Sequence, residues 1–199
     1  MINLSKINSS ANIFNRFTCL DTPFVGLKII DRQQIDDNRG FLSRIFCSKE
    51  LTEAGWRNPI AQINHAVTNR KGAVRGMHFQ YTPYAEMKLI TCLRGAIWDV
   101  AVDLRVGSAT FLQWYAAELT ATNNRAILIP EGFAHGFQTL SDGCELLYLH
   151  SSAYKPEAES GLSPLDPLLS ISWPLPISDL SEKDAQQLPV GTEFKGVPV

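Results

Sequence analysis

Short apolar runs separated by turn residues fill the middle of the chain. Many of these runs alternate apolar and polar positions, as a β-strand with one buried face does. The breakers between them are short groups rich in Gly, Asn, Pro and Ser. The pattern predicts strands at residues 25–30, 41–47, 62–67, 88–93, 96–103, 111–119, 125–129, 134–140 and 145–150. Strands at this spacing are typical of an all-β sandwich or barrel.

Two short segments carry helix signals instead. Residues 48–55 begin with a candidate N-cap serine and end at a glycine. Near the C-terminus, Ser181 and Asp184 have the spacing of a helix cap. The proline-rich residues 154–176 are expected to wrap the barrel as an ordered loop. We therefore expect an all-β protein with short peripheral helices, forming one domain over residues 1–199.

Composition narrows the class of protein. With 45% hydrophobic and 19% charged residues, the 199-residue chain has the balance of a globular domain. Its net charge of −2 provides no global field for nucleic acid or an anionic membrane, and no apolar run approaches the roughly 20 residues of a membrane span. Residues 1–15 contain Asn and Ser where a signal peptide needs an apolar core. The four cysteines form no C-x-x-C pair, so we expect buried thiols in a cytoplasmic protein.

The densest set of chemically active residues is segment 75–80 together with Glu86 and Lys88. In a regular strand, alternation places Arg75 and His78 on opposite faces. A histidine base and a cation held inside a barrel could remove a proton and stabilise the resulting anion. The alternative is a core histidine beside surface charges.

A second candidate is His135, which the turn at Pro130 and Gly132 delivers to the start of a strand. Together with the first segment, this arrangement is similar to the two motifs of the cupin barrel, which often chelate a metal. Three candidate ligands are available, but Gln80 occupies the place of a fourth, a second histidine. They are His78, Glu86 and His135. A catalytic ion with open positions is therefore an alternative.

Alternation in residues 145–150 places Tyr148 and His150 on one face. An inward Tyr148 hydroxyl could donate a proton, or it could simply line the barrel. His65 and His150 carry no motif and are expected to be structural. Helix capping by itself accounts for Asp184.

Taken together, these segments resemble the dTDP-4-dehydrorhamnose 3,5-epimerase family of sugar-nucleotide epimerases. The resemblance extends in order from Asp37 to Asp184, and the set of matches is specific although each one is short. The matching segments are DNRGF (37–41), QINH (62–65), RGMHFQ (75–80), KL (88–89), DVAVDLR (99–105), IPEGFAHGF (129–137), ELLY (145–148), DP (166–167), ISWP (171–174) and LSEKD (180–184).

The resemblance implies a cupin-like jelly-roll barrel that forms a homodimer and uses neither a metal nor an organic cofactor. It implies that His78 is the general base, oriented by Asp184. Lys88 would stabilise the enolate oxygen formed from the 4-keto group, and Tyr148 would return a proton from the opposite face of the sugar ring. The implied contacts to sugar or nucleotide are Arg39, Gln62, Asn64, Arg75, His135 and Tyr154, of which Arg39 would reach a neighbouring subunit's site.

Two positions depart from the family pattern. Ile35 occupies a place where Phe is common, and Arg44 a place where many members have Glu. Both lie where the family approaches the nucleotide, so the base of the nucleotide stays open. A diphosphate would be met by guanidinium groups such as Arg39, Arg75 and Arg44.

The resulting expectation is an enzyme that epimerises a nucleoside-diphosphate-linked 4-keto-6-deoxy sugar at C3, C5 or both. The alternatives are a single-carbon epimerase of another nucleotide sugar, a metal-dependent cupin enzyme, and a non-catalytic sugar-binding barrel.

Overall fold

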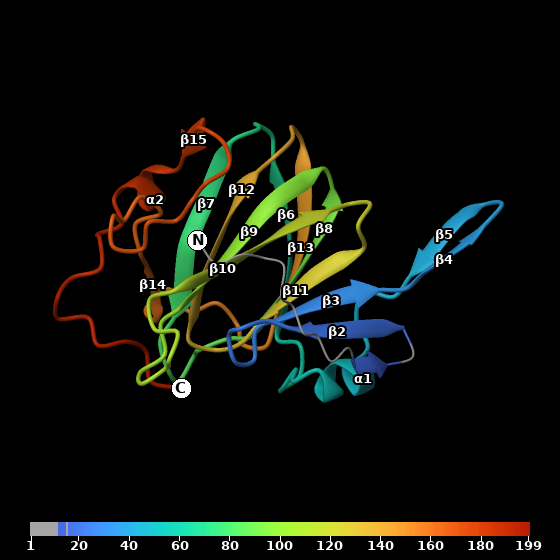
Figure 1. Cartoon of the computed structure of the whole chain (residues 1–199), viewed down its shortest axis with the longest axis horizontal. Coiled ribbons are helices and arrows are strands. Elements are labelled where there is room, and N and C mark those ends of the chain that lie inside the picture. Colours follow the sequence, from blue (N-terminus) through green and yellow to red (C-terminus); the bar gives the residue numbers. More distant parts are fainter. Residues whose placement is uncertain (1–11, 15) are drawn as a thin grey trace.

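Two β-sheets packed against each other form the body of the molecule, and one hairpin projects to the side (Figure 1). The structure is a computed structural model that describes residues 12–14 and 16–199. The expectation that residues 1–15 carry no signal peptide therefore falls almost entirely outside the described residues. No helix in the described part of the chain is long and apolar enough to cross a membrane.

Strands that are far apart in sequence lie side by side in both sheets. The first sheet has the order β1 (Asn12–Phe14), β2 (Phe17–Asp21), β3 (Lys28–Arg32), β11 (Arg125–Ile129), β8 (Lys88–Arg94), β13 (Cys144–His150) and β6 (Gln62–Thr68). The second has the order β10 (Trp114–Thr120), β9 (Ala96–Asp103), β12 (Phe133–Thr139), β7 (Ala73–Gln80) and β14 (Glu159–Gly161), with β15 (Asp179–Leu180) parallel to β7. This arrangement of two packed sheets is that of a jelly roll.

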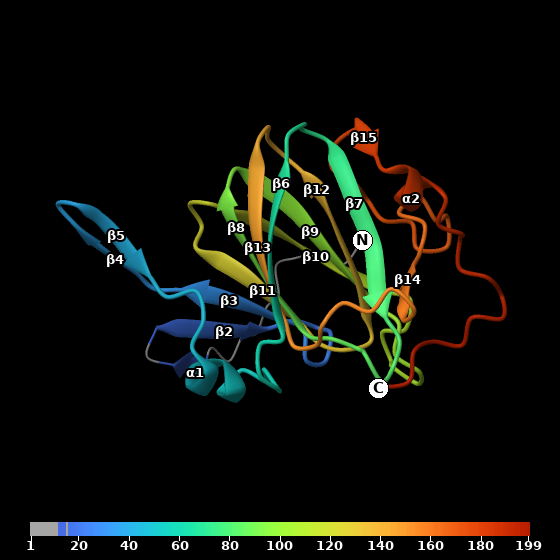
Figure 2. The same ribbon diagram turned by 180° about the vertical axis from the view of Figure 1, so that it is seen from behind.

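The projecting hairpin consists of β4 (Gln34–Asp37) and β5 (Gly40–Ser43). It extends away from the two sheets, as the views from both sides show (Figures 1 and 2). The two described helices are both short: α1 (Ser48–Glu53) and α2 (Glu182–Ala185). Ser181 caps α2, because its hydroxyl accepts the backbone N–H of Asp184 at 3.1 Å.

The predicted strands 96–103 and 125–129 are confirmed to the residue, and most others differ only at their ends. Strand β3 begins at Lys28 because the three residues before it form a turn, in which the N–H of Leu27 bonds the carbonyl of Phe24 at 3.1 Å. Strand β5 ends at Ser43, since the chain then turns toward α1. Strand β10 begins at Trp114 rather than at Phe111, because Phe111 closes a turn onto the carbonyl of Ser108.

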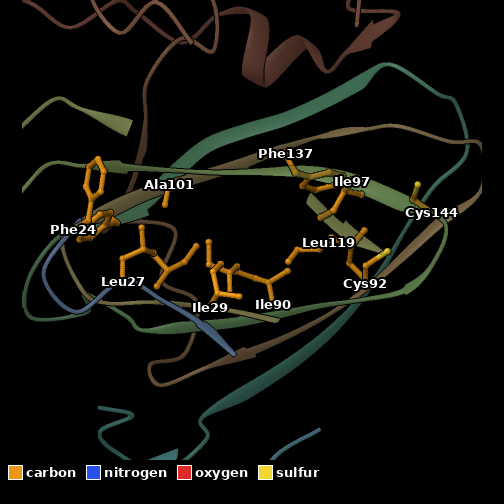
Figure 3. Packing of buried hydrophobic residues seen from close by; sticks show 14 residues of the cluster. Phe24, Leu27, Ile29, Ile90, Cys92, Ile97, Ala101, Leu119, Phe137 and Cys144 are labelled. Carbon is orange, nitrogen blue, oxygen red and sulfur yellow. The ribbon is translucent and has the colours of Figure 1, made fainter. Parts of the chain in front are cut away.

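Apolar side chains from both sheets meet between the layers (Figure 3). Ile29 and Ile90 come from the first sheet, and Ala101 and Phe137 come from the second. A fully buried Ile or Phe side chain stabilises a fold by about 1.5–3 kcal/mol, so this cluster is a major source of stability. Phe137 also lines the cavity described below, and there the dry core gives way to polar groups.

Two further apolar clusters cover the outer faces of the sheets. One lies under α1 and includes Leu51 and Trp56. The other lies on the second sheet, where Leu162 and Leu169 of the proline-rich segment pack against β7 and β9. Of the cysteines, Cys19, Cys92 and Cys144 are buried and Cys47 is partly buried, and all four are free thiols.

Candidate active site

A cavity of about 750 Å³ opens between β6, β8 and β13 of one sheet and β7 and β12 of the other. Its volume is in the range of small-molecule sites, and its lining is rich in ionisable side chains. Eight of the ten residues expected at a site line this cavity: Asn64, Arg75, His78, Lys88, His135, Tyr148, Tyr154 and Asp184.

The expectation that Arg75 and His78 lie on opposite faces of their strand is wrong, because both line the cavity. The register between β12 and β7 explains this: His135 pairs with His78, and Phe137 pairs with Arg75. Between these two pairs β12 advances by two residues and β7 by three, so β7 contains a β-bulge. The extra residue brings Arg75 round to the face of His78.

The bulge depends on two facing glycines. Gly76 has a φ of +133°, and a Cβ on it would lie 2.5 Å from the Cα of Gly136. A Cβ on Gly136 would in turn lie 2.5 Å from the sulfur of Met77. Side chains at either position would separate β7 from β12, so the glycines place His78 and His135 next to each other.

His78 is paired with a carboxylate from the far end of the chain. Its Nε2 lies 2.6 Å from Oδ1 of Asp184, at the start of α2. Burial opposes ionisation of Asp184, but hydrogen bonds from His78, Ser181 and the N–H of Gly76 outweigh it and hold the pKa of Asp184 below its ordinary value. An ionised Asp184 can only accept a hydrogen bond, so Nε2 of His78 carries the proton and Nδ1 is free to act as a base.

Lys88 on β8 reaches into the same cavity from the opposite sheet. Its ammonium lies 3.3 Å from the carbonyl oxygen of His78 and 3.3 Å from Oε1 of Glu86. The other oxygen of Glu86 lies 2.8 Å from Nδ1 of His150. Burial alone would raise the pKa of Glu86, but Lys88 and His150 lower it by more. The pKa of Glu86 therefore lies below its ordinary value, and the carboxyl is ionised.

Tyr148 on β13 stands between two histidines. Its ring packs edge-on against His135 with centroids 5.9 Å apart, and is stacked on His150 at 6.0 Å. Burial, together with the carboxyl of Asp99, raises the pKa of Tyr148 far above its ordinary value. The phenol therefore stays protonated at neutral pH and is available as a proton donor. Nε2 of His135 is bound to Oδ2 of Asp99 at 2.9 Å.

The rim of the cavity is closed by hydrogen bonds around Tyr154. Its hydroxyl donates to Oε2 of Glu159 at 2.7 Å, and Lys183 donates to the same oxygen at 2.6 Å. The backbone N–H of Tyr154 is bound by Oε1 of Gln62 at 3.0 Å, and Nε2 of Gln62 donates to Asn64 at 3.0 Å. Gln62, which does not itself line the cavity, thus supports two residues that do.

Three residues expected near the nucleotide lie elsewhere in this chain. Arg39 is on the projecting hairpin, where its side chain is 85% exposed and pairs with Asp37 at 2.6 Å. Ile35 is on the same hairpin. Arg44 forms an ion pair with Glu50 of α1. The expectation that Arg44 helps to bind the diphosphate is not met within one chain, because this ion pair lies outside the cavity lining.

The three candidate metal ligands do not converge. His78, Glu86 and His135 each have a separate partner, namely Asp184, His150 and Asp99 respectively. Within residues 12–14 and 16–199, no group of three or more His, Cys, Asp or Glu side chains is placed to hold a metal ion.

Three residues of the site were not identified from the sequence as parts of this network. Asp99 lies in a matched segment to which the sequence analysis assigns no role. Glu86 appears there among the chemically active residues and as a possible metal ligand, and His150 is expected to be structural. A signal for His150 was present, because alternation placed it on the face of Tyr148. The cross-strand pairing of His150 with Lys88 depends on register, which the local pattern does not give.

Comparison with known proteins agrees with this geometry. Residues 21–191 match the family model described as dTDP-4-dehydrorhamnose 3,5-epimerase. A protein of that name from Sinorhizobium fredii is 39% identical over 174 residues, covering 84% of this chain and 89% of that protein. A dTDP-4-dehydrorhamnose 3-epimerase from Streptomyces niveus is 40% identical over 161 residues, covering 81% of this chain and 77% of that protein.

A solved structure gives the same result for the fold. It is that of the dTDP-6-deoxy-D-glucose-3,5-epimerase from Legionella pneumophila in complex with dTDP-4-keto-L-rhamnose. It superposes with a TM-score of 0.83 at 38% sequence identity, covering 87% of this chain and 92% of that one. The expected jelly-roll barrel is therefore confirmed.

Proposed function

The chain belongs to the dTDP-4-dehydrorhamnose 3,5-epimerase family, and we propose that its cavity is where the family's reaction takes place. It is an enzyme, an epimerase of dTDP-linked 4-keto-6-deoxy sugars at C3, C5 or both. Our proposal is the finer statement that it inverts both carbons, with His78 as base and Tyr148 as acid.

One observation carries this proposal. One cavity is lined by three groups that this chemistry needs. They are the imidazole of His78 on β7, with Nδ1 available as a base, the ammonium of Lys88 on β8, and the protonated phenol of Tyr148 on β13. A base and an acid on opposite sides of a sugar ring are what inversion of a carbon requires, and groups on different strands can face each other in this way. Each proton-transfer group contributes roughly 10²–10⁴-fold in rate.

The reaction begins at the carbon next to the ketone. Nδ1 of His78 takes the proton from that carbon. The electron pair of the C–H bond forms the carbon–carbon double bond of the enolate, and the π pair of the ketone moves onto the C4 oxygen. Asp184 stabilises the imidazolium that forms, because its carboxylate already accepts the Nε2 hydrogen bond at 2.6 Å. The side chain of Lys88 is only 9% exposed, so its ammonium stabilises the enolate oxygen more strongly than it would in water. Tyr148 then delivers its proton to the carbon from the opposite face, and the enolate returns to the ketone. Proton exchange with solvent restores the phenol of Tyr148 and the neutral imidazole of His78 before the second carbon reacts.

We assign nucleotide binding to the basic side chains of the cavity lining. Arg70, Arg75 and Lys183 line it, and a guanidinium can bind two phosphate oxygens at once. The relative from Legionella pneumophila holds a dTDP-sugar, so thymidine diphosphate is the nucleotide we propose for this chain.

We further propose that residues 1–199 form one domain that works as a homodimer in the cytoplasm. The hairpin of β4 and β5 supports the dimer, because Phe41 and Leu42 are 65% and 71% exposed at its end and Arg39 projects beside them. On a partner's barrel these apolar side chains would be covered and Arg39 would reach that subunit's cavity. The free thiols agree with a reducing compartment.

The test is solvent-deuterium incorporation into a dTDP-4-keto-6-deoxyhexose, followed by NMR at each carbon. We expect deuterium at both C3 and C5. Incorporation at C3 alone would replace the proposal by a single-carbon epimerase, and no incorporation would refute it. Thermal shifts with thymidine, uridine, cytidine and guanosine diphosphates test the nucleotide, since a ligand stabilises the fold according to its concentration relative to its dissociation constant.

A further inference from the structure

Glu86 and His150 form a buried pair in the cavity that the proposed chemistry does not use. Their side chains are 10% and 11% exposed, and Oε2 of Glu86 lies 2.8 Å from Nδ1 of His150. The remaining oxygen of Glu86 lies 3.3 Å from the ammonium nitrogen of Lys88, and the side chain of Lys88 is 9% exposed. Three ionisable side chains thus share one small, poorly solvated volume. Burying such groups is costly, so the arrangement calls for a function.

The hydrogen bonds of this network converge on the Glu86 carboxylate. Glu86 is ionised and accepts from both neighbours, so Nδ1 of His150 carries a proton. Nε2 of His150 is then left as an acceptor, and the side-chain amide of Asn64 lies 3.4 Å from it. The result is a chain of four side chains, from Asn64 through His150 and Glu86 to Lys88.

Strand pairing gives this chain a rigid base. His150 on β13 is the cross-strand partner of Lys88 on β8, and on its other side it is the partner of Gln62 on β6. His150 is therefore held by the sheet, whereas Lys88 ends in an ammonium on a flexible four-carbon stem. Within the cavity, Glu86 connects the rigid element to the flexible one.

We propose that His150 and Glu86 are positioning residues that direct the Lys88 ammonium toward the C4 oxygen of the substrate. His150 fixes the Glu86 carboxylate, and the carboxylate fixes Lys88. Neither residue touches the reacting atoms in this assignment. The inference rests on the proposed function for the role of Lys88, but the positioning itself is a property of the free protein.

Kinetics of His150 variants test the first link. We expect His150→Leu to lower kcat about tenfold to a hundredfold with little change in KM, because a small misplacement of a catalytic group slows the chemical step. His150→Asn carries an amide nitrogen at the place of Nδ1, and should recover most of the loss. The matched control is His65→Leu, which removes a His–Glu pair of the same composition, to Glu145 at 3.3 Å, on the outer face. It should leave kcat unchanged.

A double-mutant cycle tests whether His150 acts through Lys88. In a Lys88→Met background, His150→Leu should cause no further loss, since the group it positions is absent. Losses that simply multiply would overturn the proposal, because His150 would then act on the substrate independently. A His150→Leu enzyme with wild-type kcat would overturn it as well.

A measurement without substrate separates this inference from the proposed function. Trace acetylation of the free protein, read by mass spectrometry, compares Lys88 with the exposed Lys49 in the same sample. Loss of a charged hydrogen bond should make Lys88 about tenfold more reactive in His150→Leu and Glu86→Gln, but not in His65→Leu. Unchanged reactivity in both cavity variants would overturn the positioning role even if the enzyme is active. Absence of deuterium exchange in the wild-type enzyme would refute only the proposed function.

Discussion

The neighbouring strands β7 and β12 each carry a histidine that is paired with a carboxylate, yet the surroundings of the two pairs differ. His78 pairs with Asp184 at 2.6 Å, and its register partner His135 pairs with Asp99 at 2.9 Å. The side chain of His78 is 31% exposed to the cavity, whereas that of His135 is only 6% exposed.

The carboxylates respond in opposite directions. Asp184 accepts from His78 and the N–H of Gly76, and its pKa lies below the ordinary value. Burial raises the pKa of Asp99, whose Oδ1 has no hydrogen-bond partner in the described part of the molecule. The same two residue types thus give an accessible histidine beside an ionised acid in one place, and a dry, closed pair in the other. Hydrogen bonds and access, rather than residue types, are the reason why we propose His78 and not His135 as the base.

The largest expected effect is the contrast between His78→Asn and His135→Asn. The first should abolish solvent-deuterium incorporation, a loss of at least roughly 10²–10⁴-fold. The second should lower the rate less, because His135 lines the cavity and packs against Tyr148 but has no proposed role in removing the proton. Mass spectrometry of the recovered sugar measures both. Near-normal exchange in His78→Asn would reverse the assignment of the two pairs.

Tyr148 packs against His135. A variant of Tyr148 distinguishes removal of the first proton from delivery of the second. In Tyr148→Phe the first proton can still leave, so exchange should persist while net epimerisation falls roughly 10²-fold or more. The two rates are measured on one sample by NMR of the sugar. Equal loss of both would remove the separate acid role.

Asp184→Ser distinguishes an orienting carboxylate from a helix cap. Ser181 already caps α2, so serine at position 184 should change the melting temperature little. Turnover should fall about tenfold to a hundredfold, because His78 loses its oriented partner. If activity survived, helix capping would be the function of this residue. Circular dichroism melting and initial rates on the same preparation test this.

The smallest effect concerns pH and stability. A carboxyl pKa below the usual value of about 3.9 means that Asp184 stabilises the fold above that pH, and this contribution is lost as the pH falls through the folded-state pKa. For Asp99, whose pKa is raised, the contribution is full at low pH and is lost as the pH rises. The melting temperature of wild type minus that of Asp184→Asn should therefore fall as the pH is lowered. The melting temperature of wild type minus that of Asp99→Asn should rise over the same range. Each kcal/mol corresponds to about 2–4 °C, and parallel curves would contradict the opposite shifts.

Local patterns predicted the strands well, because alternation and turn residues act over a few positions. Strands β9 and β11 match their predicted bounds. The bulge in β7 was not predicted, since it arises from the fit between Gly76 and Gly136, 60 positions apart. That one irregularity places Arg75 and His78 on the same face of the strand, where simple alternation predicts opposite faces.

Pairings across the fold were beyond local reasoning for the same cause. His78 meets Asp184 across a sequence separation of 106 residues, and His150 meets Glu86 across 64. The register of several strands decides such contacts, and no single segment contains it. The family resemblance supplied the role of Asp184, whereas the network of His150 emerged only from the structure.

The position of Asp184 near the end of the chain also has a consequence in time. Strands carrying His78, Lys88 and Tyr148 have all been synthesised once His150 is added to the chain. Asp184 follows 34 residues later, which at typical translation rates of 5–20 residues per second takes about 2 to 7 s. During that interval the growing chain contains His78, the proposed base, without Asp184, its proposed orienting carboxylate. If Asp184 has the proposed role, full turnover requires that translation has passed Asp184, and a chain released before that point lacks the orienting carboxylate.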